Sequence, residues 1–241
     1  MEEKVTFKSS DLNLSGVVHR PDDMAAGERR PAVLILHGFG SRKDAGNVTG
    51  PTNMFMNWGY VVLRFDMRGC GDSDGLFGHL LCLDQVDDTR AAIDFMQSRP
   101  EVDPDRIAVV GSSFGAAVAV YSGGVDKRVA AVISSGGWGN GERKFRGQHP
   151  GEEAWQKFTS MLERGRKHRE ENGEPLFVDR YEIVPIPEHL RANMPSGSVQ
   201  QFTADTAIGM MDFTAEEVIG KIAPRPVLLL HSSVDSVTPT E

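Results

Sequence analysis

The sequence predicts an α/β fold: a mostly parallel sheet with helices on both faces and an inserted cap. Three observations favour this fold class. Short apolar runs typical of buried strands alternate with segments of helical periodicity. The chain has 241 residues, enough for one large domain with an insertion. One long charged segment interrupts the alternation. Strands separated by helices pair in parallel and are covered on both faces.

The expected strands and helices follow one another along most of the chain. The segments expected to form strands are residues 5–8, 12–18, 31–36, 60–65, 107–110, 129–134 and 227–230. The segments expected to form helices are residues 46–58, 84–96 and 114–121. The first two strands alternate in polarity, so we expect them to pair antiparallel. In the first helix, the apolar positions Met54, Phe55 and Trp58 are expected to share a face.

The charged and irregular segment 136–213 is expected to form a cap inserted into the core. The core then consists of residues 1–135 and is continued by residues 214–241. Three apolar side chains of the cap recur at helical spacing, namely Trp155, Phe158 and Leu162. This spacing predicts an amphipathic helix. Its apolar face either packs on the main domain or belongs to a lid that contacts substrate, and the sequence leaves both interpretations open.

Composition and charge exclude several classes of function. The formal net charge is −8, which argues against nucleic acid or an anionic membrane surface as the main partner. No apolar run approaches the ~20 residues of a membrane span, and the N-terminus lacks the features of a secretory signal, so we expect a cytoplasmic protein. Cys70 and Cys82 are too few for a disulfide framework and lack metal-site spacing, so we expect free thiols. No metal and no organic cofactor is implied.

The pentapeptide Gly111-Ser112-Ser113-Phe114-Gly115 is typical of a serine nucleophile. It follows an apolar run and precedes a helix of small residues, which is the context that this motif requires. Such a turn exposes the central serine above the sheet, and the flanking glycines leave room where strand and helix cross. We therefore predict that Ser113 is the nucleophile. The backbone N–H of Phe114 is then the first donor of an oxyanion hole.

A second oxyanion donor is expected in the loop after residues 31–36. That loop reads His37-Gly38-Phe39-Gly40, in which the glycines give the backbone freedom to turn. The N–H of Phe39 is the predicted donor. His37 is expected to order the loop rather than to act as the base.

Asp235 is the predicted acid of the site. It follows the strand expected at residues 227–230, and active sites of parallel sheets form at the carboxyl ends of strands. Asp235 should therefore lie on the same edge of the sheet as Ser113. The alternative interpretation is an ordinary aspartate in a turn.

With these motifs in order, the chain resembles the serine-dependent α/β-hydrolase family. The motifs that carry the resemblance are residues 37–40, 65–73, 111–115 and 227–235. They span nearly the whole chain apart from the cap. The sequence is most similar to the dienelactone-hydrolase, feruloyl-esterase and prolyl-oligopeptidase-like branches. In this family the loop at residues 66–73 is mainly structural, so the resemblance assigns no catalysis to it.

The resemblance also implies a catalytic histidine on a loop after one further strand. No histidine follows Asp235 in the sequence, so we expect this histidine downstream of Glu241, with the family's last strand and helix absent from this chain. The other histidines are expected to be surface or packing residues: His19, His79, His149, His168, His189 and His231. A substitute base from this set is the less favoured alternative.

The motifs together predict a serine hydrolase that cleaves carboxylic esters through an acyl-enzyme on Ser113. Trp138 is predicted to contact substrate, and with Phe39 and Phe114 it would line an apolar acyl pocket. The expected partner is a small-molecule ester. An amidase, peptidase or thioesterase of the same fold remains an alternative, as does a non-catalytic binding protein. A homodimer that supplies the further strand and histidine by exchange is also left open.

Overall fold

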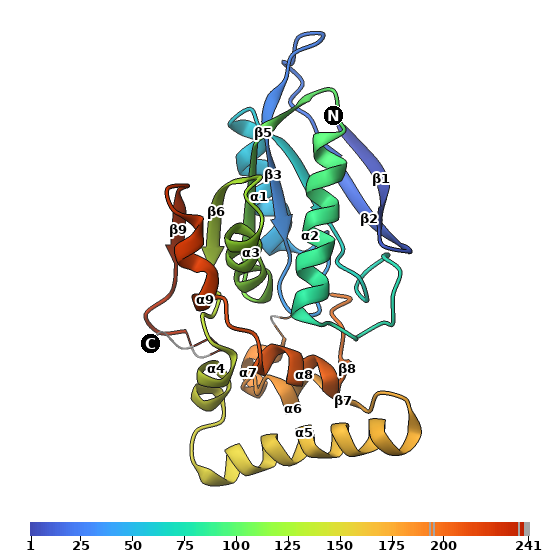
Figure 1. The fold of residues 1–241 in the computed structure, drawn as a ribbon, viewed down its shortest axis with the longest axis vertical. Helices are drawn as coiled ribbons and strands as arrows, with labels where there is room; N and C mark the ends of the chain where they lie inside the picture. The colour runs from blue at the N-terminus through green and yellow to red at the C-terminus, as the bar shows by residue number, and fades with distance from the viewer. Residues whose placement is uncertain (193, 195, 236, 239–241) are drawn as a thin grey trace.

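The computed structural model describes residues 1–192, 194, 196–235, 237 and 238, and their core is a sheet of seven strands (Figure 1). The strands are β1 (Glu2–Ser9), β2 (Leu12–His19), β3 (Arg30–Leu36), β4 (Val61–Phe65), β5 (Val102–Ser112), β6 (Val129–Ser135) and β9 (Val227–Leu230). Their order across the sheet is β1-β2-β4-β3-β5-β6-β9. The pairs β1–β2 and β2–β4 are antiparallel, and all others are parallel. The predicted, mostly parallel sheet is therefore confirmed.

Helices cover both faces of this sheet. Those of the core are α1 (Gly46–Asn57), α2 (Cys82–Gln97), α3 (Phe114–Val125) and α9 (Glu216–Ile219), and a 3-10 turn, η1 (Gly220–Ile222), follows α9. Figure 1 shows α1 behind the sheet and the other helices in front of it. Successive side chains of β3 point to opposite faces of the sheet, so they enter two separate hydrophobic clusters. Val33 and Ile35 pack with Phe55 of α1, whereas Leu34 and Leu36 belong to the larger core on the opposite face.

The apolar positions expected to share a face of α1 are not the set that meets the sheet. Met54 is 40% exposed and Trp58 is 63% exposed, while Phe55 is buried. The stripe that meets the sheet is Val48, Thr52 and Phe55. These three residues lie at i, i+4 and i+7, which places them on one side of a helix.

The segment between β6 and α9 folds into a group of small elements. They are α4 (Gly141–Gln148), α5 (Glu152–Asn172), β7 (Phe177–Asp179), α6 (Arg180–Ile183), α7 (Glu188–Arg191), β8 (Gln201–Thr203) and α8 (Ala204–Met211). They lie together beyond the carboxyl ends of the parallel strands, with α5 outermost (Figure 1). We call this group the cap. Among the described helices, none is both long and apolar enough to cross a membrane.

The apolar face of α5 packs inside the cap. Phe158 and Leu162 are buried, and the ring of Phe158 stacks on Phe145 of α4 with a centroid separation of 4.6 Å. On the next turns, Gly165 approaches Ala204 of α8 so closely that a Cβ added at Gly165 would lie 2.3 Å from the alanine Cβ. The predicted helix is present, and its apolar side is covered by α4 and α8.

Candidate active site

Ser113 lies at the turn between β5 and α3, at the carboxyl edge of the sheet. Its φ is +53°, a conformation that residues other than glycine rarely adopt and that costs about 1–3 kcal/mol. Its N–H donates to the carbonyl oxygen of Ser135 at 2.8 Å, which ties the turn to β6. The turn is sharp because only this residue separates β5, which ends at Ser112, from α3, which begins at Phe114. Such a sharp turn is the one expected for an exposed serine nucleophile.

Two glycines make this turn sterically feasible. A Cβ added at Gly111 would lie 2.0 Å from the carbonyl oxygen of Gly115, and one added at Gly115 would lie 2.5 Å from that of His37. The start of α3 therefore crosses both β5 and the loop after β3 at backbone contact distance. The Cβ position of Gly38 lies 3.6 Å from Ser113 Cβ. The predicted oxyanion loop, residues 37–40, is thus adjacent to the predicted nucleophile.

His37 holds this loop through both of its ring nitrogens. Its Nε2 accepts the N–H of Met67 at 3.1 Å, so Nδ1 carries the proton and donates to the carbonyl oxygen of Gly38 at 2.9 Å. The ring is 1% exposed, and burial lowers the pKa of His37, which keeps the imidazole neutral. These bonds leave neither nitrogen free to accept a proton from Ser113.

A buried ion pair ties the chain just after this loop, at Lys43, to the chain after β4. Lys43 donates from its backbone N–H and from Nζ to the two oxygens of Asp66, each at 2.6 Å. Asp66 also accepts the N–H of Asp72 at 2.9 Å. Both Lys43 and Asp66 are buried, so the carboxylate is shielded from water. Both of its oxygens accept hydrogen bonds from the surrounding chain. The loop after β4 supports the site without presenting a group to it.

The cap binds the oxyanion loop from the other side through Arg180. Its Nη2 donates to the carbonyl oxygen of Phe39 at 2.7 Å, and its Nη1 donates to that of Val199 at 2.8 Å. The N–H of Val199 in turn donates to the carbonyl oxygen of Gly40 at 2.8 Å. The ring of Phe202 stacks on Phe39 with a centroid separation of 4.1 Å. Arg180 is 4% exposed, and burial lowers its pKa to about 10.

A capping box places Arg180 where it can reach the loop. Asp179 is the N-cap of α6, and its side chain accepts the N–H of Tyr181 at 2.8 Å. Glu182 completes the box by accepting the N–H of Asp179 at 3.3 Å. Arg180 is the first residue of this short helix. The sequence Asp-x-x-Glu signals this helix start, but we expected no role for Arg180 from the sequence.

Asp235 and Ser113 line the same cavity, whose volume is about 620 Å³. Asp235 Oδ1 accepts the N–H groups of Val237 and Thr238, each at 2.8 Å. Its Oδ2 lies 3.8 Å from His231 Nε2, which is beyond hydrogen-bond distance. His231 Nε2 instead lies 2.6 Å from the carbonyl oxygen of Thr238. In the described part of the chain, Ser113 Oγ makes no hydrogen bond with a histidine.

A second cavity of about 180 Å³ lies on the cap side of Ser113. Phe39 and Trp138 line it, together with Lys144, which the sequence did not single out. The ring of Phe114 packs between the rings of Phe39 and Trp138, with centroid separations of 6.0 and 5.8 Å. The structure therefore brings the residues predicted for nucleophile, oxyanion loop and substrate contact to one place. Ser113 lies between the two cavities.

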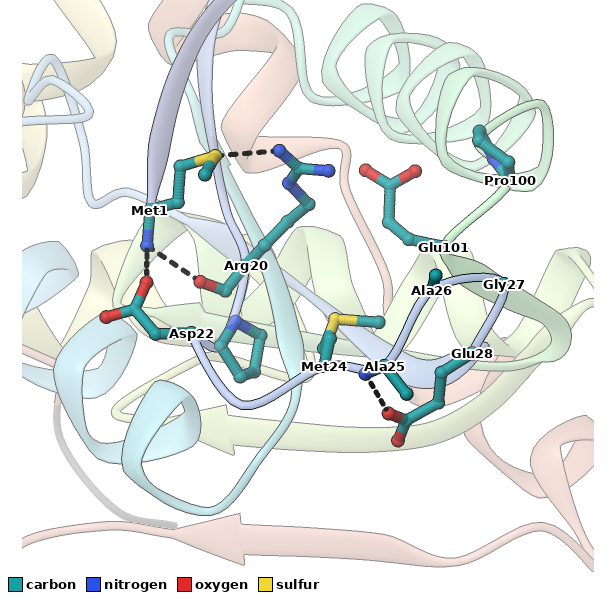
Figure 2. A pocket seen from close by; sticks show the side chains of 11 residues that line it. Met1, Arg20, Asp22, Met24, Ala25, Ala26, Gly27, Glu28, Pro100 and Glu101 are labelled. Atoms are coloured by element: carbon teal, nitrogen blue, oxygen red, sulfur yellow. Dashed lines mark hydrogen bonds and ion pairs between the residues drawn. The ribbon is translucent and has the colours of Figure 1, made fainter.

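A further cavity of about 360 Å³ lies far from this edge (Figure 2). Its lining includes Arg20 after β2, the loop at residues 24–28 before β3, and Glu101 before β5, so it lies at the opposite edge of the parallel strands. In Figure 2 the terminal amine of Met1 donates to Asp22 at 2.7 Å. No serine, cysteine or histidine lines it among the described residues. This cavity is therefore not a candidate for acyl transfer.

The fold and this turn define an α/β hydrolase. More particularly, the chain belongs to the family described as serine aminopeptidase, S33, whose model matches residues 27–241. Two solved structures are similar to the structure of this chain. The hypothetical protein PA2218 from Pseudomonas aeruginosa has a TM-score of 0.78 at 26% identity, covering 96% of this chain and 77% of that one. The α/β hydrolase GrgF from Penicillium sp. sh18 has a TM-score of 0.78 at 22% identity, covering 99% and 82%.

Three curated relatives are similar in sequence. The quorum-quenching protein AidA of Acinetobacter baumannii (strain MDR-ZJ06) is 35% identical over 131 residues, 54% of this chain and 42% of the relative. PA2218 is 28% identical over 249 aligned positions, 95% of this chain and 66% of the relative. The thiohydrolase apmlB of Arthrinium phaeospermum is 25% identical over 273 positions, 100% of this chain and 83% of the relative. The chain thus spans less than two thirds of the length of AidA and PA2218.

Proposed function

We propose that the chain carries the core of a serine hydrolase that cleaves carboxylic esters through an acyl-enzyme on Ser113. The backbone of Ser113 is the observation that carries this proposal. A positive φ at a strand-to-helix turn, between two cavities, is a strained arrangement that a purely structural serine does not need. The family to which the chain belongs supports a hydrolase in general.

In the proposed reaction, Ser113 Oγ attacks the acyl carbon and its proton passes to a base. The N–H groups of Phe39 and Phe114 stabilise the negative oxygen of the tetrahedral intermediate. The alcohol then leaves with the proton, and an acyl-enzyme remains. Water attacks this acyl-enzyme in turn, releasing the carboxylic acid and restoring Ser113. The cavity lined by Phe39 and Trp138 is the proposed acyl pocket, because ligand pockets are mostly apolar with a few polar groups.

The proposed base is a histidine that Asp235 orients in the cavity shared by Asp235 and Ser113. His37 does not fit this role because both of its nitrogens bond to the main chain. His231 does not fit it because its Nε2 lies against a carbonyl oxygen rather than Asp235. In the order of the motifs that the family shows, the histidine follows the acid in the sequence.

A thioester is the second candidate substrate class. The relative apmlB, which aligns over the whole of this chain, is described as a thiohydrolase. Thioesters and oxygen esters pass through the same acyl-enzyme, so the same residues serve both reactions. Comparing kcat/KM for an ester and a thioester with the same acyl group decides between them.

A fluorophosphonate probe tests the nucleophile directly. We expect it to label the complete gene product at Ser113 and to fail on the Ser113→Ala variant. Ser112→Ala is the matched control, because Ser112 is the neighbouring serine of the same motif, and this variant should still be labelled. Peptide mapping identifies the modified serine. If the complete, folded protein is not labelled, the hydrolase proposal is wrong and the non-catalytic alternative is favoured.

A further inference from the structure

The acyl pocket is lined by basic side chains although the protein as a whole is acidic. Two basic residues, Lys144 and Arg180, line this cavity, and no aspartate or glutamate does so within the described residues. The formal net charge of the chain is −8, so the basic residues of the pocket are not a reflection of overall composition. A cavity whose charged side chains all carry the same sign, and whose other walls are apolar, attracts ligands of opposite charge.

Neither basic group forms an ion pair among the described residues, but Lys144 is the more distinctive: Arg180 donates to two backbone carbonyl oxygens, whereas Lys144 donates to a single side-chain amide oxygen. It is 7% exposed, and its Nζ donates to Gln148 Oε1 at 2.9 Å. The ammonium otherwise faces aromatic rings, with Nζ 3.8 Å from the centroid of Phe145 and 5.0 Å from that of Trp138. No carboxylate of the described residues forms an ion pair with it. Burial lowers the pKa of Lys144 to about 7.

Burying such a group is costly, and its position suggests a reason for the cost. An ammonium has three donor hydrogens, and here the amide oxygen of Gln148 is its only oxygen acceptor among the described residues. A buried amine without a counter-ion is stabilised when an anion enters beside it. Lys144 lines the pocket that also contains Ser113, so a ligand in that pocket can bring the anion.

Two neighbouring N–H donors also lack hydrogen-bond acceptors. Trp138 Nε1 and Arg180 Nε are buried and have no hydrogen-bond partner among the described residues. Both residues line the same cavity as Lys144. The hydroxyl of Ser41, which also lines the cavity, is likewise buried without a partner among the described residues and can donate as well. These donors together complement oxygen acceptors on a ligand.

We propose that the acyl pocket binds an acyl chain that ends in a carboxylate, with Lys144 as the partner of that carboxylate. The substrate class is then a monoester or monothioester of a dicarboxylic acid. This inference rests on the proposed function, because it places the acyl group of the substrate in this cavity. A carboxylate fits better than a phosphate because of charge: the Nη atoms of Arg180 already bond to two carbonyl oxygens, which leaves one lysine to balance the ligand, and a doubly charged group would exceed it.

The same lysine discriminates against neutral acyl chains. A chain with an apolar end leaves the ammonium buried and unpaired, so it gains nothing from Lys144 and seals it further from water. A charged hydrogen bond contributes about 1.5–3 kcal/mol, which corresponds to a preference of about tenfold or more for the carboxylate.

Direct binding tests this preference without turnover. The protein is the complete gene product with Ser113→Ala, and the probes are the monomethyl and dimethyl esters of adipic, suberic and sebacic acids, measured by calorimetry. We expect at least one monoester to bind about tenfold or more tightly than its diester. The added substitution Lys144→Met should abolish this preference, while Lys144→Arg should keep most of it. Lys127→Met is the matched control, because Lys127 is an exposed lysine between α3 and β6.

Proton uptake gives a second readout that a purely structural role would not change. At pH 8 the monoester should bind with uptake of protons, because the carboxylate raises the pKa of Lys144; Lys144→Met should show none. The other titratable groups that interact with Lys144 are Cys82 and His149. Burial raises the pKa of Cys82 and lowers that of His149, so both are neutral at this pH.

Equal binding of monoesters and diesters, or no binding of any probe, would overturn the inference. So would a preference that survives Lys144→Met in a protein with unchanged circular dichroism. The two measurements distinguish a failure of this inference from a failure of the hydrolase proposal. Fluorophosphonate labelling at Ser113 without a carboxylate preference refutes only this inference, whereas the preference without labelling supports a carboxylate-binding pocket in a protein that is not a hydrolase.

Discussion

Replacing Arg180 should impair hydrolysis far more than it impairs folding. Its guanidinium joins the cap to the proposed oxyanion loop through the carbonyl oxygens of Phe39 and Val199, at 2.7 and 2.8 Å. Arg180 bonds to the carbonyl oxygen of Phe39, and the N–H of the same residue is the predicted oxyanion donor. Fixing the carbonyl therefore helps to fix the direction of this N–H. The variants are Arg180→Met, which removes the charge, and Arg180→Lys, which keeps it but lacks the planar fork.

The expected effect on stability is small because two contributions oppose each other. Hydrogen bonds from a charged donor contribute about 1.5–3 kcal/mol each, so two of them contribute about 3–6 kcal/mol. Burial lowers the pKa of Arg180 to about 10, which corresponds to a cost of roughly 3 kcal/mol for the charged form. The net loss for Arg180→Met is about 0–3 kcal/mol, or at most about 10 °C in Tm for a chain of this size.

The expected effect on hydrolysis is larger. Complete loss of one oxyanion donor lowers kcat by about 10²–10³, and a displaced donor retains part of its effect. We therefore expect kcat to fall by about 10- to 100-fold in Arg180→Met, with KM nearly unchanged, because the donor acts on charge that develops in the transition state. Arg180→Lys should restore only a part of the loss.

The assay is steady-state hydrolysis of a short-chain p-nitrophenyl ester by the complete gene product, with thermal unfolding of each variant in parallel. Arg166→Met is the matched control, since Arg166 is an exposed arginine of the same cap and should affect neither measurement. The reasoning is refuted by an Arg180→Met variant that keeps the kcat of the unmodified protein. A fall in kcat that merely follows the fraction of unfolded protein would also refute it.

Three other substitutions test separate parts of the site. Gly40→Ala should lower the free energy of unfolding by about 2–4 kcal/mol, since φ is +55° and the new Cβ would lie 2.4 Å from Phe202 Cζ. Gly46→Ala, where no atom lies within 4 Å of the new Cβ, is its control in the same denaturation experiment. Lys144→Met should change how stability depends on pH. The pKa of about 7 in the folded protein lies below that of an unfolded lysine, so the unfolded chain binds the extra proton and stability should rise from about pH 7 to about pH 10. Lys144→Met removes this rise, and parallel curves for the two proteins would contradict it. Asp235→Asn should lower kcat of the complete gene product by about 10³–10⁴-fold with an unchanged Tm, and a loss below tenfold would exclude Asp235 as the acid.

The core could be predicted from the sequence because its signals are local. Strands buried on both faces read as apolar runs, and the small residues after Ser113 allow α3 to pack closely on the sheet. The turn at Ser113 was predictable for the same reason, since Gly111 and Gly115 are the residues that a close crossing of backbones demands. These features depend on neighbours in the sequence rather than on partners far along the chain.

The cap could not be predicted in the same way, because its elements are short and its key contacts are distant in sequence. Arg180 contacts the carbonyl of Phe39, which lies 141 positions earlier. The Asp179–Glu182 pair signals a helix start but not what the arginine between them binds. Lys144 stands in a charged segment, where a lysine is expected to be solvated, and only the packing of Trp138 and Phe145 around it reveals its burial.

The cap is better understood as part of the proposed oxyanion hole than as a separate cover over it. From the core, His37 holds the loop by bonding to Met67 and to Gly38. From the cap, Arg180 and Val199 hold the same loop by bonding to Phe39 and Gly40. Because the loop has no strand or helix of its own, its geometry depends on both sets of bonds. A movement of the cap would therefore be expected to displace Phe39, the proposed oxyanion donor, because Arg180 of the cap bonds to its carbonyl oxygen.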